Sequence, residues 1–215
     1  MKILLFGATG SVGNAALEAC LAVSVVDEVC AITRRPMIST GSKLRTYVHK
    51  DFLNYATVEE AFRNVDACLY CLGISATQVS KEDYRTITYS YAVAAANMLK
   101  RYSPNAAFHY ISGKGTNASS RMLWARVKAQ TERDLMELVD ADCWRPALID
   151  APPSASLPKL YALVYPVGRL LKPFPSLYVH GHDLTRAMLQ ATREGLRRRI
   201  FENPEIRQLA ERASF

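Results

Sequence analysis

The chain has 215 residues, of which 49% are hydrophobic and 22% are charged, and its formal net charge is +7. This length and composition indicate a single globular domain, residues 1–215, that can bury a full core. No apolar run reaches the roughly 18 residues of a membrane span, and an apolar strand pattern stands at the N-terminus, so we expect a cytoplasmic protein without signal peptide or membrane segment.

Basic residues are spread along the chain, except for a cluster of arginines within residues 193–199. Because no aromatic residues are interleaved with this cluster, we interpret it as a solvated helix face and expect neither nucleic acid nor a membrane as a partner. An anionic cofactor would balance part of the positive charge.

The five cysteines lie in apolar runs, which predicts reduced and buried thiols. Cys68 and Cys71 stand three residues apart in a strand pattern, so they face opposite sides of a sheet and cannot form a disulfide. His180 and His182 have no further cysteine or histidine at a ligand spacing. We therefore expect no metal site.

A glycine motif follows the apolar run at residues 3–6 and opens a helical pattern over residues 12–23. Strand, glycine turn and helix are the context of a dinucleotide-binding loop: Gly7 permits the sharp exit from the strand, Gly10 lets the backbone approach a pyrophosphate, and Gly13 lets the helix pack on the sheet. The residues expected to bind the cofactor here are Gly7, Thr9, Gly10, Ser11, Val12 and Gly13.

The end of the second strand, residues 28–33, predicts which cofactor is bound. An NAD-selective site places an acidic residue about 20 positions after the glycine loop, on the ribose 2′-hydroxyl. Here that position holds Thr33, followed by Arg34 and Arg35. A guanidinium with no acid beside it favours a 2′-phosphate, so we predict NADP(H). The alternative is a solvated loop before Pro36.

Two further strands are predicted. Residues 44–49 alternate between apolar and polar side chains, and residues 66–73 form a strongly apolar run. We expect Asp51 and Phe52 to meet the adenine, and a capping box at residues 57–60 to open a helix that ends at Val65. After the fourth strand, the residues expected to reach the cofactor ribose through backbone atoms are Cys71, Leu72 and Gly73.

The second half of the chain begins with a helix from Ser80, its N-cap, to about Arg101. The fifth strand, residues 107–112, ends at Ser112, where ligands of open α/β sheets bind. The alternative is that Ser112 is ordinary turn composition. Ser119 or Ser120 then caps a helix to about Leu138, and residues 143–149 form a sixth strand. Residues 151–193 leave the strand–helix alternation, and we interpret them as a small helical cap on the substrate side.

The chain resembles the atypical short-chain dehydrogenase/reductases, particularly the small TIP30-like (HTATIP2-like) and epimerase-like oxidoreductases. The likeness runs almost end to end. It includes the glycine motif, Cys71-Leu72-Gly73, Ile111-Ser112-Gly113-Lys114-Gly115, Val127-Lys128, Arg145-Pro146 and Glu202-Asn203. The resemblance implies a Rossmann-like, doubly wound parallel α/β sheet that binds NADP(H).

In this family a serine polarises a carbonyl, a tyrosine donates the proton, and a lysine four residues later holds the nicotinamide ribose and lowers the tyrosine pKa. Ser112 and Lys128 match the serine and the lysine, so the resemblance implies catalytic roles for both and cofactor binding by Lys128. The tyrosine position holds Trp124. An indole N–H donates a hydrogen bond but is no acid near neutral pH.

Three functions remain open from the sequence. The first is an NADPH-dependent oxidoreductase acting on a small carbonyl or enone-type molecule, with water or another tyrosine supplying the proton. The second is an NADP-binding sensor or scaffold without turnover. The third is an isomerase, lyase or cyclase that does no net redox chemistry. We also expect a possible homodimer, because the helix from Ser80 to Arg101 carries more apolar residues than one buried face needs.

Overall fold

The computed structural model describes residues 1–37, 41–151 and 169–215. Its centre is a seven-stranded parallel sheet with the order β3-β2-β1-β4-β5-β6-β9. These strands are β1 (Lys2–Phe6), β2 (Glu28–Thr33), β3 (Leu44–Val48), β4 (Ala67–Tyr70), β5 (Ala107–Ile111), β6 (Asp142–Arg145) and β9 (Ile200–Glu202). The strand order reverses between β1 and β4, which is the position where open α/β sheets bind ligands. The predicted doubly wound sheet is confirmed.

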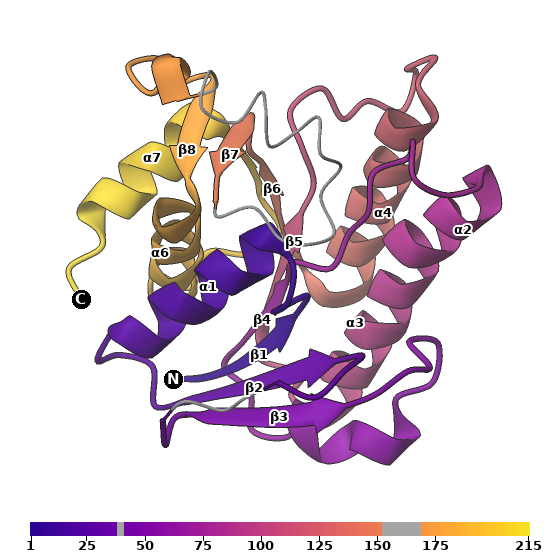
Figure 1. Ribbon diagram of the computed structural model, residues 1–215, viewed down its shortest axis with the longest axis vertical. Coiled ribbons are helices and arrows are strands. Elements are labelled where there is room, and N and C mark those ends of the chain that lie inside the picture. Colours follow the sequence, from indigo (N-terminus) through magenta and orange to yellow (C-terminus); the bar gives the residue numbers. More distant parts are fainter. Residues whose placement is uncertain (38–40, 152–168) are drawn as a thin grey trace.

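Helices cover both faces of this sheet (Figure 1). One face carries α1 (Ser11–Ala22), α6 (Gly181–Arg193) and α7 (Asn203–Arg212). The other carries the 3₁₀ segment η1 (Ala56–Phe62), α2 (Lys81–Arg85), the π-helical turn η2 (Thr86–Ser90), α3 (Tyr91–Tyr102) and α4 (Leu123–Val139). Neighbouring strand residues alternate between the two cores, so Leu5 packs on the α1 side while Leu4 and Phe6 pack on the α3 side.

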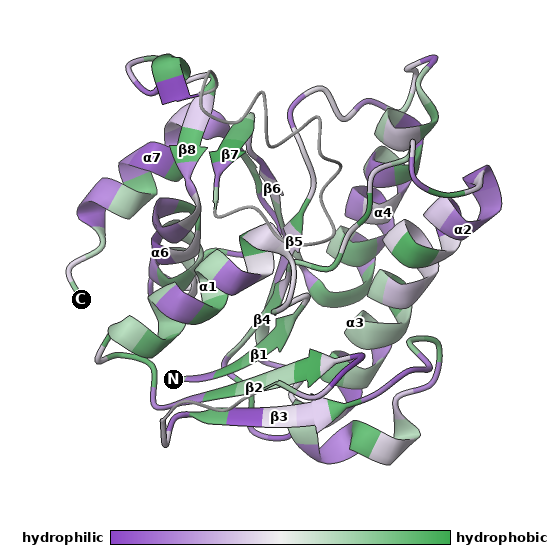
Figure 2. Ribbon diagram, in the orientation of Figure 1, coloured by the Kyte–Doolittle hydropathy of each residue, from purple (hydrophilic) through white to green (hydrophobic). Residues whose placement is uncertain are grey.

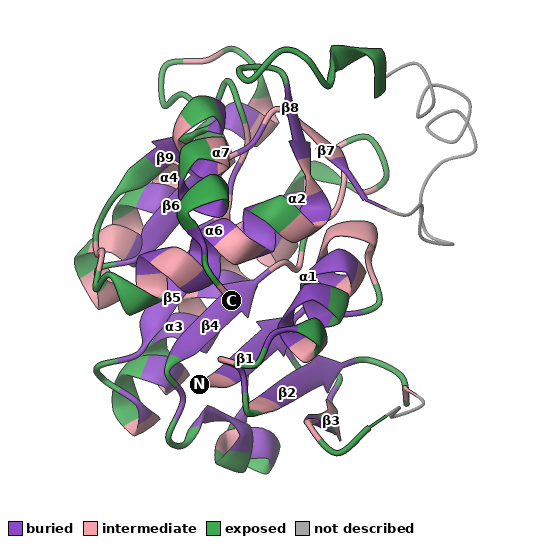
Figure 3. Ribbon diagram, turned by 90° about the vertical axis from the view of Figure 1, so that its left-hand side faces the viewer, coloured by how far each residue is buried: buried purple, intermediate pink, exposed green. Residues whose placement is uncertain are grey.

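The burial pattern follows from this layering. Hydrophobic residues dominate the central strands (Figure 2), and the strands are buried in the view turned by 90° (Figure 3). Both faces of a parallel sheet are covered, so its strands need near-continuous apolar runs, as at Ile3, Leu4, Leu5 and Phe6, all of which are fully buried.

Some predicted boundaries were wrong. The predicted strand at residues 143–149 is two strands: β6 ends at Arg145, and β7 (Leu148–Asp150) pairs with β8 (Tyr178–His180) in a separate two-stranded sheet. Pro146 lies between β6 and β7 and has no N–H with which to continue the hydrogen-bond ladder of β6.

Two of the predicted helix caps were wrong and one is confirmed. Thr57 does not open a capping box, because its hydroxyl contacts the His49 ring instead, at 3.2 Å from Nδ1. The helix expected from Ser119 or Ser120 begins at Leu123, since the Ser120 hydroxyl accepts a hydrogen bond from the Met122 N–H, at 3.1 Å, before the helix starts. Ser80 caps α2 as predicted: its hydroxyl accepts from the Asp83 N–H at 3.0 Å.

The predicted cap, residues 151–193, includes residues 152–168, which lie outside the described part of the chain. Of the remainder, α6 packs against α1 and α7 in the helix layer on the sheet. The cap therefore stays a prediction. β8, β9 and α7 had no counterpart in the sequence-based expectation.

The loop between β1 and α1 leaves no room for side chains at two of its glycines. Gly7 has a φ of +78°, in the left-handed region that favours glycine. A Cβ atom added to Gly7 would stand 2.7 Å from the carbonyl oxygen of Cys71, just after β4. A Cβ atom on Gly13 would stand 2.0 Å from the carbonyl oxygen of Gly7. Gly13 therefore lets the start of α1 approach the backbone of Gly7, the residue directly after β1.

A polar cluster is buried beside β5 and β6. Trp144 Nε1 donates a hydrogen bond to His109 Nδ1 at 3.2 Å, and His109 Nε2 lies 2.8 Å from Thr192 Oγ1. Asp142 Oδ2 lies 3.7 Å from His109 Nδ1 and has no hydrogen-bond partner among the described residues. Burial raises the pKa of Asp142 to about 7 and lowers the pKa of His109 to about 3. Both groups are thus held in their neutral forms below neutral pH.

Gly13→Ala should lower the free energy of unfolding by about 2–3 kcal/mol, because the added methyl group meets a backbone carbonyl that cannot rotate away. Gly73→Ala is the matched control: its added Cβ meets nothing within 4 Å, so a loss below about 0.5 kcal/mol is expected. Urea unfolding measures both. Equal losses in the two variants would contradict the packing described for Gly13.

Asp142→Asn should flatten the fall of stability with rising pH. The pKa of Asp142 is higher in the folded protein than its ordinary value of 3.8, so its stabilising contribution is complete below that value and is lost as the pH rises through about 7. Relative to wild type, the variant should gain about 1 kcal/mol or more in free energy of unfolding between about pH 5 and about pH 8.

Urea titrations at the two pH values measure this gain. Asp183→Asn, which changes an exposed carboxylate of α6, is the control and should follow the wild-type pH dependence. If Asp142→Asn also follows it, Asp142 is ionised in the folded protein over this whole range and the argument fails.

Candidate functional site

The N-terminus of α1 faces the switch point between β1 and β4. Gly10 is the N-cap, and its N–H donates to the Gly7 carbonyl at 2.8 Å. Thr9 is exposed, while Ser11 and Val12 are half-buried. The first turn of α1 carries no acidic residue. Its N–H groups and the positive end of the helix dipole can therefore bind an anion such as a pyrophosphate.

The end of β2 presents arginine side chains to solvent. Thr33 is buried, and its hydroxyl donates to the carbonyl oxygen of Arg35 at 2.8 Å, which fixes the turn after the strand. Arg34 and Arg35 are exposed. Arg34 has no ion-pair partner within the described ranges. Its guanidinium can therefore bind an anionic ligand without breaking an existing ion pair.

The residues after β3 have fewer groups free to contact a cofactor than the sequence suggested. The Phe52 side chain is only 2% exposed and packs against Tyr91, with 5.5 Å between ring centroids. Only the backbone of Phe52 therefore remains for an adenine. Asp51 is exposed, and its Oδ1 accepts from the Leu53 N–H at 3.1 Å. Its second carboxylate oxygen is the one that can accept from a ligand.

The residues after β4 form one wall of the switch point. The Cys71 N–H donates to the Phe6 carbonyl at 3.2 Å, and the Cys71 carbonyl is the group that excludes a side chain at Gly7. Cys71 and Leu72 are half-buried, and Gly73 is exposed with open space around it. Backbone contact between Cys71, Leu72 or Gly73 and the cofactor ribose stays a prediction.

The turn after β5 brings together the three residues predicted to carry chemistry. Lys128, on α4, donates from Nζ to the Ser112 carbonyl at 2.5 Å and lies 3.4 Å from the Ile111 carbonyl. Trp124, one turn earlier on α4, lies over Gly115, where an added Cβ would stand 3.4 Å from Trp124 Cη2. Gly115 has a φ of +88°, a backbone conformation that favours glycine.

Lys128 is a half-buried cation held by backbone oxygens. Burial lowers the pKa of its ammonium to about 8. The carbonyl dipoles of Ser112 and Ile111 are its hydrogen-bond acceptors. Near neutral pH Lys128 is therefore mostly charged, but it can release a proton at modestly higher pH.

The structure adds Thr116, which sequence reasoning missed. Its hydroxyl donates to the Gly113 carbonyl at 2.8 Å and lies 2.9 Å from Ser112 Oγ. Ser112 and Thr116 are both buried. The only sequence signal was a second hydroxyl residue four positions after Ser112, within a turn that contains two glycines.

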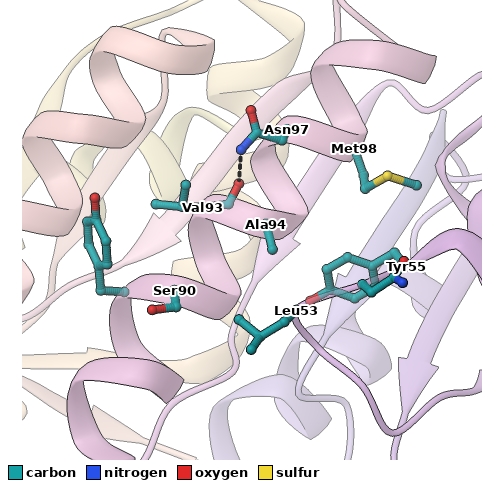
Figure 4. Close-up of a pocket in the computed structure, with 9 residues that line it drawn as sticks. Leu53, Tyr55, Ser90, Val93, Ala94, Asn97 and Met98 are labelled. Atoms are coloured by element: carbon teal, nitrogen blue, oxygen red, sulfur yellow. Dashed lines mark hydrogen bonds between the residues drawn. The ribbon is translucent and has the colours of Figure 1, made fainter. Parts of the chain in front are cut away.

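A cavity of about 410 Å³ lies beside α3 (Figure 4). It is lined by the loop before η1, including Leu53 and Tyr55, and by Val93, Ala94 and Met98 on α3. None of the residues predicted to bind cofactor or to carry chemistry lines it.

Curated relatives match about two thirds of the chain. "Leucinostatins biosynthesis cluster protein T" of Purpureocillium lilacinum is 28% identical over 141 residues, which cover 64% of this chain and 52% of that protein. "Protein FMP52, mitochondrial" of Candida albicans is 24% identical, covering 64% and 62%. "Protein HTATIP2" of Rattus norvegicus is 23% identical, covering 64% and 57%. The chain thus matches less than two thirds of the length of each of these relatives.

Solved structures share the fold over nearly the whole chain. A short-chain dehydrogenase/reductase family oxidoreductase from Burkholderia thailandensis has a TM-score of 0.71 at 17% identity, covering 96% of this chain and 92% of that one. MoeE5 in complex with UDP-glucuronic acid and NAD has a TM-score of 0.70 at 15% identity, covering 94% and 76%. UDP-glucose 4-epimerase from Thermus thermophilus, in complex with NAD, has a TM-score of 0.68 at 17% identity, covering 99% and 83%.

The sequence profile of the NAD dependent epimerase/dehydratase family matches residues 3–139, more than half of the chain. The match begins in β1 and ends with α4, so it includes the glycine loop, the turn after β5, Trp124 and Lys128. In the described part of the chain, no helix has the length and hydrophobicity that crossing a membrane requires. The predicted resemblance is confirmed, and the chain belongs to the NAD dependent epimerase/dehydratase family.

Proposed function

We propose that the chain binds NADP(H) at the switch point between β1 and β4. The observation that carries this proposal is the glycine loop beside the N-terminus of α1, where Gly7 packs on Cys71 and Gly13 packs on Gly7 with no room for a side chain at either position. Family membership supports a nicotinamide cofactor. MoeE5 and the Thermus thermophilus UDP-glucose 4-epimerase, both solved in complex with NAD, support the same class of ligand.

The preference for NADP(H) is supported by the end of β2. Thr33 occupies the position of the acidic residue that selects NAD, and its hydroxyl is already bonded to the Arg35 carbonyl. Arg34 is exposed beside it. A 2′-phosphate would then meet a guanidinium rather than a carboxylate, and bidentate contacts of this kind are charge-assisted.

We further propose an oxidoreductase that acts on a small carbonyl or enone-type molecule near the turn after β5. A bound nicotinamide would supply or accept a hydride. In this proposal Lys128, held by the Ser112 and Ile111 carbonyls, presents its remaining N–H to the cofactor ribose. Trp124 donates a hydrogen bond through Nε1 but transfers no proton, so water or another tyrosine supplies it.

One observation favours a second candidate function without net redox chemistry. Trp124 stands where this family's proton donor stands, and an indole cannot replace a phenol as an acid. An isomerase, lyase or cyclase, or an NADP sensor without turnover, would tolerate this replacement. Mixing the protein with NADPH and a panel of small ketones and enones in single turnover tests the oxidoreductase. Product without a change in nicotinamide absorbance would indicate the isomerase, lyase or cyclase instead.

A homodimer and a cytoplasmic location complete the proposal. A homodimer that forms through α3 is supported by the half-buried apolar residues on this helix, among them Tyr91, Val93, Ala94 and Met98. The FMP52 relative is described as mitochondrial, so organelle fractionation would decide the location. No nucleic acid or membrane partner is part of this proposal.

Arg34→Ala should weaken NADPH binding at least about tenfold and NADH binding little, because a charge-assisted bidentate contact contributes roughly 1.5–3 kcal/mol. Calorimetric titration of both cofactors measures the ratio. Arg35→Ala, an exposed neighbour, is the control and should change that ratio less. Equal losses for NADPH and NADH in Arg34→Ala would show that Arg34 does not contact the 2′-phosphate.

Trp124→Tyr should separate the two candidate functions. In an oxidoreductase with a substitute donor, the new phenol lies one turn from Lys128 and should raise the reduction rate or leave it unchanged. In an enzyme without redox chemistry, the loss of the indole should lower turnover or ligand affinity and create no reductase activity. Lys128→Ala should weaken cofactor binding in either case.

The control is Trp124→Ala, examined with Trp124→Tyr by rate, ligand affinity and melting temperature. If both variants lose stability while activity per folded molecule stays constant, Trp124 only packs α4 against the turn, and both readings of its role are refuted.

A further inference from the structure

Ser112, Thr116 and the Gly113 carbonyl are linked by two consecutive hydrogen bonds, a hydrogen-bond chain in which every proton is donated in the same direction. Thr116 Oγ1 lies 2.8 Å from the Gly113 carbonyl oxygen and 2.9 Å from Ser112 Oγ. A carbonyl oxygen can only accept, so the single Thr116 proton points to Gly113. Ser112 then donates its own proton to Thr116. The lone pairs of Ser112 Oγ are what remains for a ligand.

The surroundings hold the chain in this direction. Ser112 is 4% exposed and Thr116 is 5% exposed, so water cannot freely replace either bond. Reversing the direction of these hydrogen bonds would leave the Thr116 and Gly113 oxygens 2.8 Å apart with no hydroxyl proton between them, which is unfavourable. The Ser112 backbone is fixed as well: its N–H donates to the Trp144 carbonyl at 2.7 Å, and its carbonyl accepts from Lys128.

The neighbouring side chain has the opposite hydrogen-bonding character. Trp124 Nε1 is a donor only, and Trp124 is half-buried over the same turn. Within residues 1–37, 41–151 and 169–215, the Trp124 indole has no hydrogen-bond partner. The turn after β5 thus carries an acceptor at Ser112 Oγ, and Trp124 beside the same turn carries a donor.

We propose that Thr116 is a positioning residue that fixes Ser112 as a hydrogen-bond acceptor, so that the site takes its ligand through a hydroxyl group. This rests on the proposed function, and it names the alcohol as the member of the alcohol–carbonyl pair that the resting site binds. An alcohol O–H donates to Ser112 Oγ. A ketone has no proton to donate and gains nothing from Ser112 until the bond to Thr116 is broken.

The test compares cyclohexanol with cyclohexanone, a matched pair that differs in this one group. The chain has two tryptophans, so protein labelled with 5-fluorotryptophan gives two fluorine signals, and Trp124→Phe assigns the Trp124 signal. Each probe is titrated onto cofactor-free and NADP⁺-loaded protein while the Trp124 signal is followed. Wild type should bind the alcohol at least threefold more tightly than the ketone.

Thr116→Val removes the hydroxyl, frees the Ser112 proton and should shift the alcohol-to-ketone ratio at least threefold toward the ketone. Thr116→Ser keeps a hydroxyl and should restore the wild-type ratio. Thr185→Val is the matched control, because Thr185 is buried and donates to the Gly181 carbonyl at 3.1 Å on α6; its ratio should equal that of wild type. If Thr116→Val does not fold, Thr116→Ala takes its place.

A ratio that is the same in wild type and Thr116→Val, or no response of the Trp124 signal to either probe, would overturn the proposal. A protein that binds no nicotinamide cofactor would refute the proposed function instead. In that case the ratio in cofactor-free protein still decides the role of Thr116, so the two failures can be told apart.

Discussion

The fold of the site depends on the contact between the glycine loop and the residues after β4. The Gly7 backbone lies so close to the Cys71 carbonyl that no side chain fits, and Gly13 lies closer still to the Gly7 carbonyl. These two contacts fix the N-terminus of α1 at the switch point between β1 and β4. They also keep side chains away from two positions of the loop, so its backbone N–H groups can approach a pyrophosphate. One steric constraint thus sets both the position and the chemistry of the proposed pyrophosphate-binding loop.

The other end of the site is held by hydrogen bonds rather than by close packing. The turn after β5 closes on itself through the Ser112–Thr116–Gly113 chain, and Lys128 ties α4 to the same turn. The Ser112 and Thr116 hydroxyl protons and the Lys128 ammonium already have acceptors within the turn. The preference for a ligand is therefore set by the groups that these bonds leave over.

Local patterns were sufficient to predict most strands of the central sheet, and the family resemblance implied their doubly wound arrangement. The apolar runs located β1, β2, β4 and β5, and Ser80 located the start of α2. The C-terminal elements were beyond such reasoning. β8 and β9 are three residues long, too short for a periodic signal. The capping box of α7 is built from Glu202 and Glu205, without the serine or threonine that usually marks one.

Prediction of the site was limited to residues that a strand end or a family motif marks. Ser112 was found because it ends a buried strand, and Lys128 and Trp124 were found by resemblance to a family. Thr116 has no such marker, because its role comes from a distance of 2.9 Å to Ser112 across a turn. Whether a hydroxyl donates or accepts depends on its neighbours in space, and that information is absent from residue spacing.

The charge of Lys128 shows how a second interaction prepares the site. Glu132 lies one turn after Lys128 on α4, where an ion pair would normally form. Arg145 on β6 instead takes both Glu132 oxygens, at 2.9 and 2.6 Å, in a bidentate pair. Lys128 is left with carbonyl dipoles as acceptors, and burial lowers its pKa to about 8. The Arg145–Glu132 pair, by occupying the carboxylate, thus keeps a partly desolvated ammonium available to a ligand at the turn after β5.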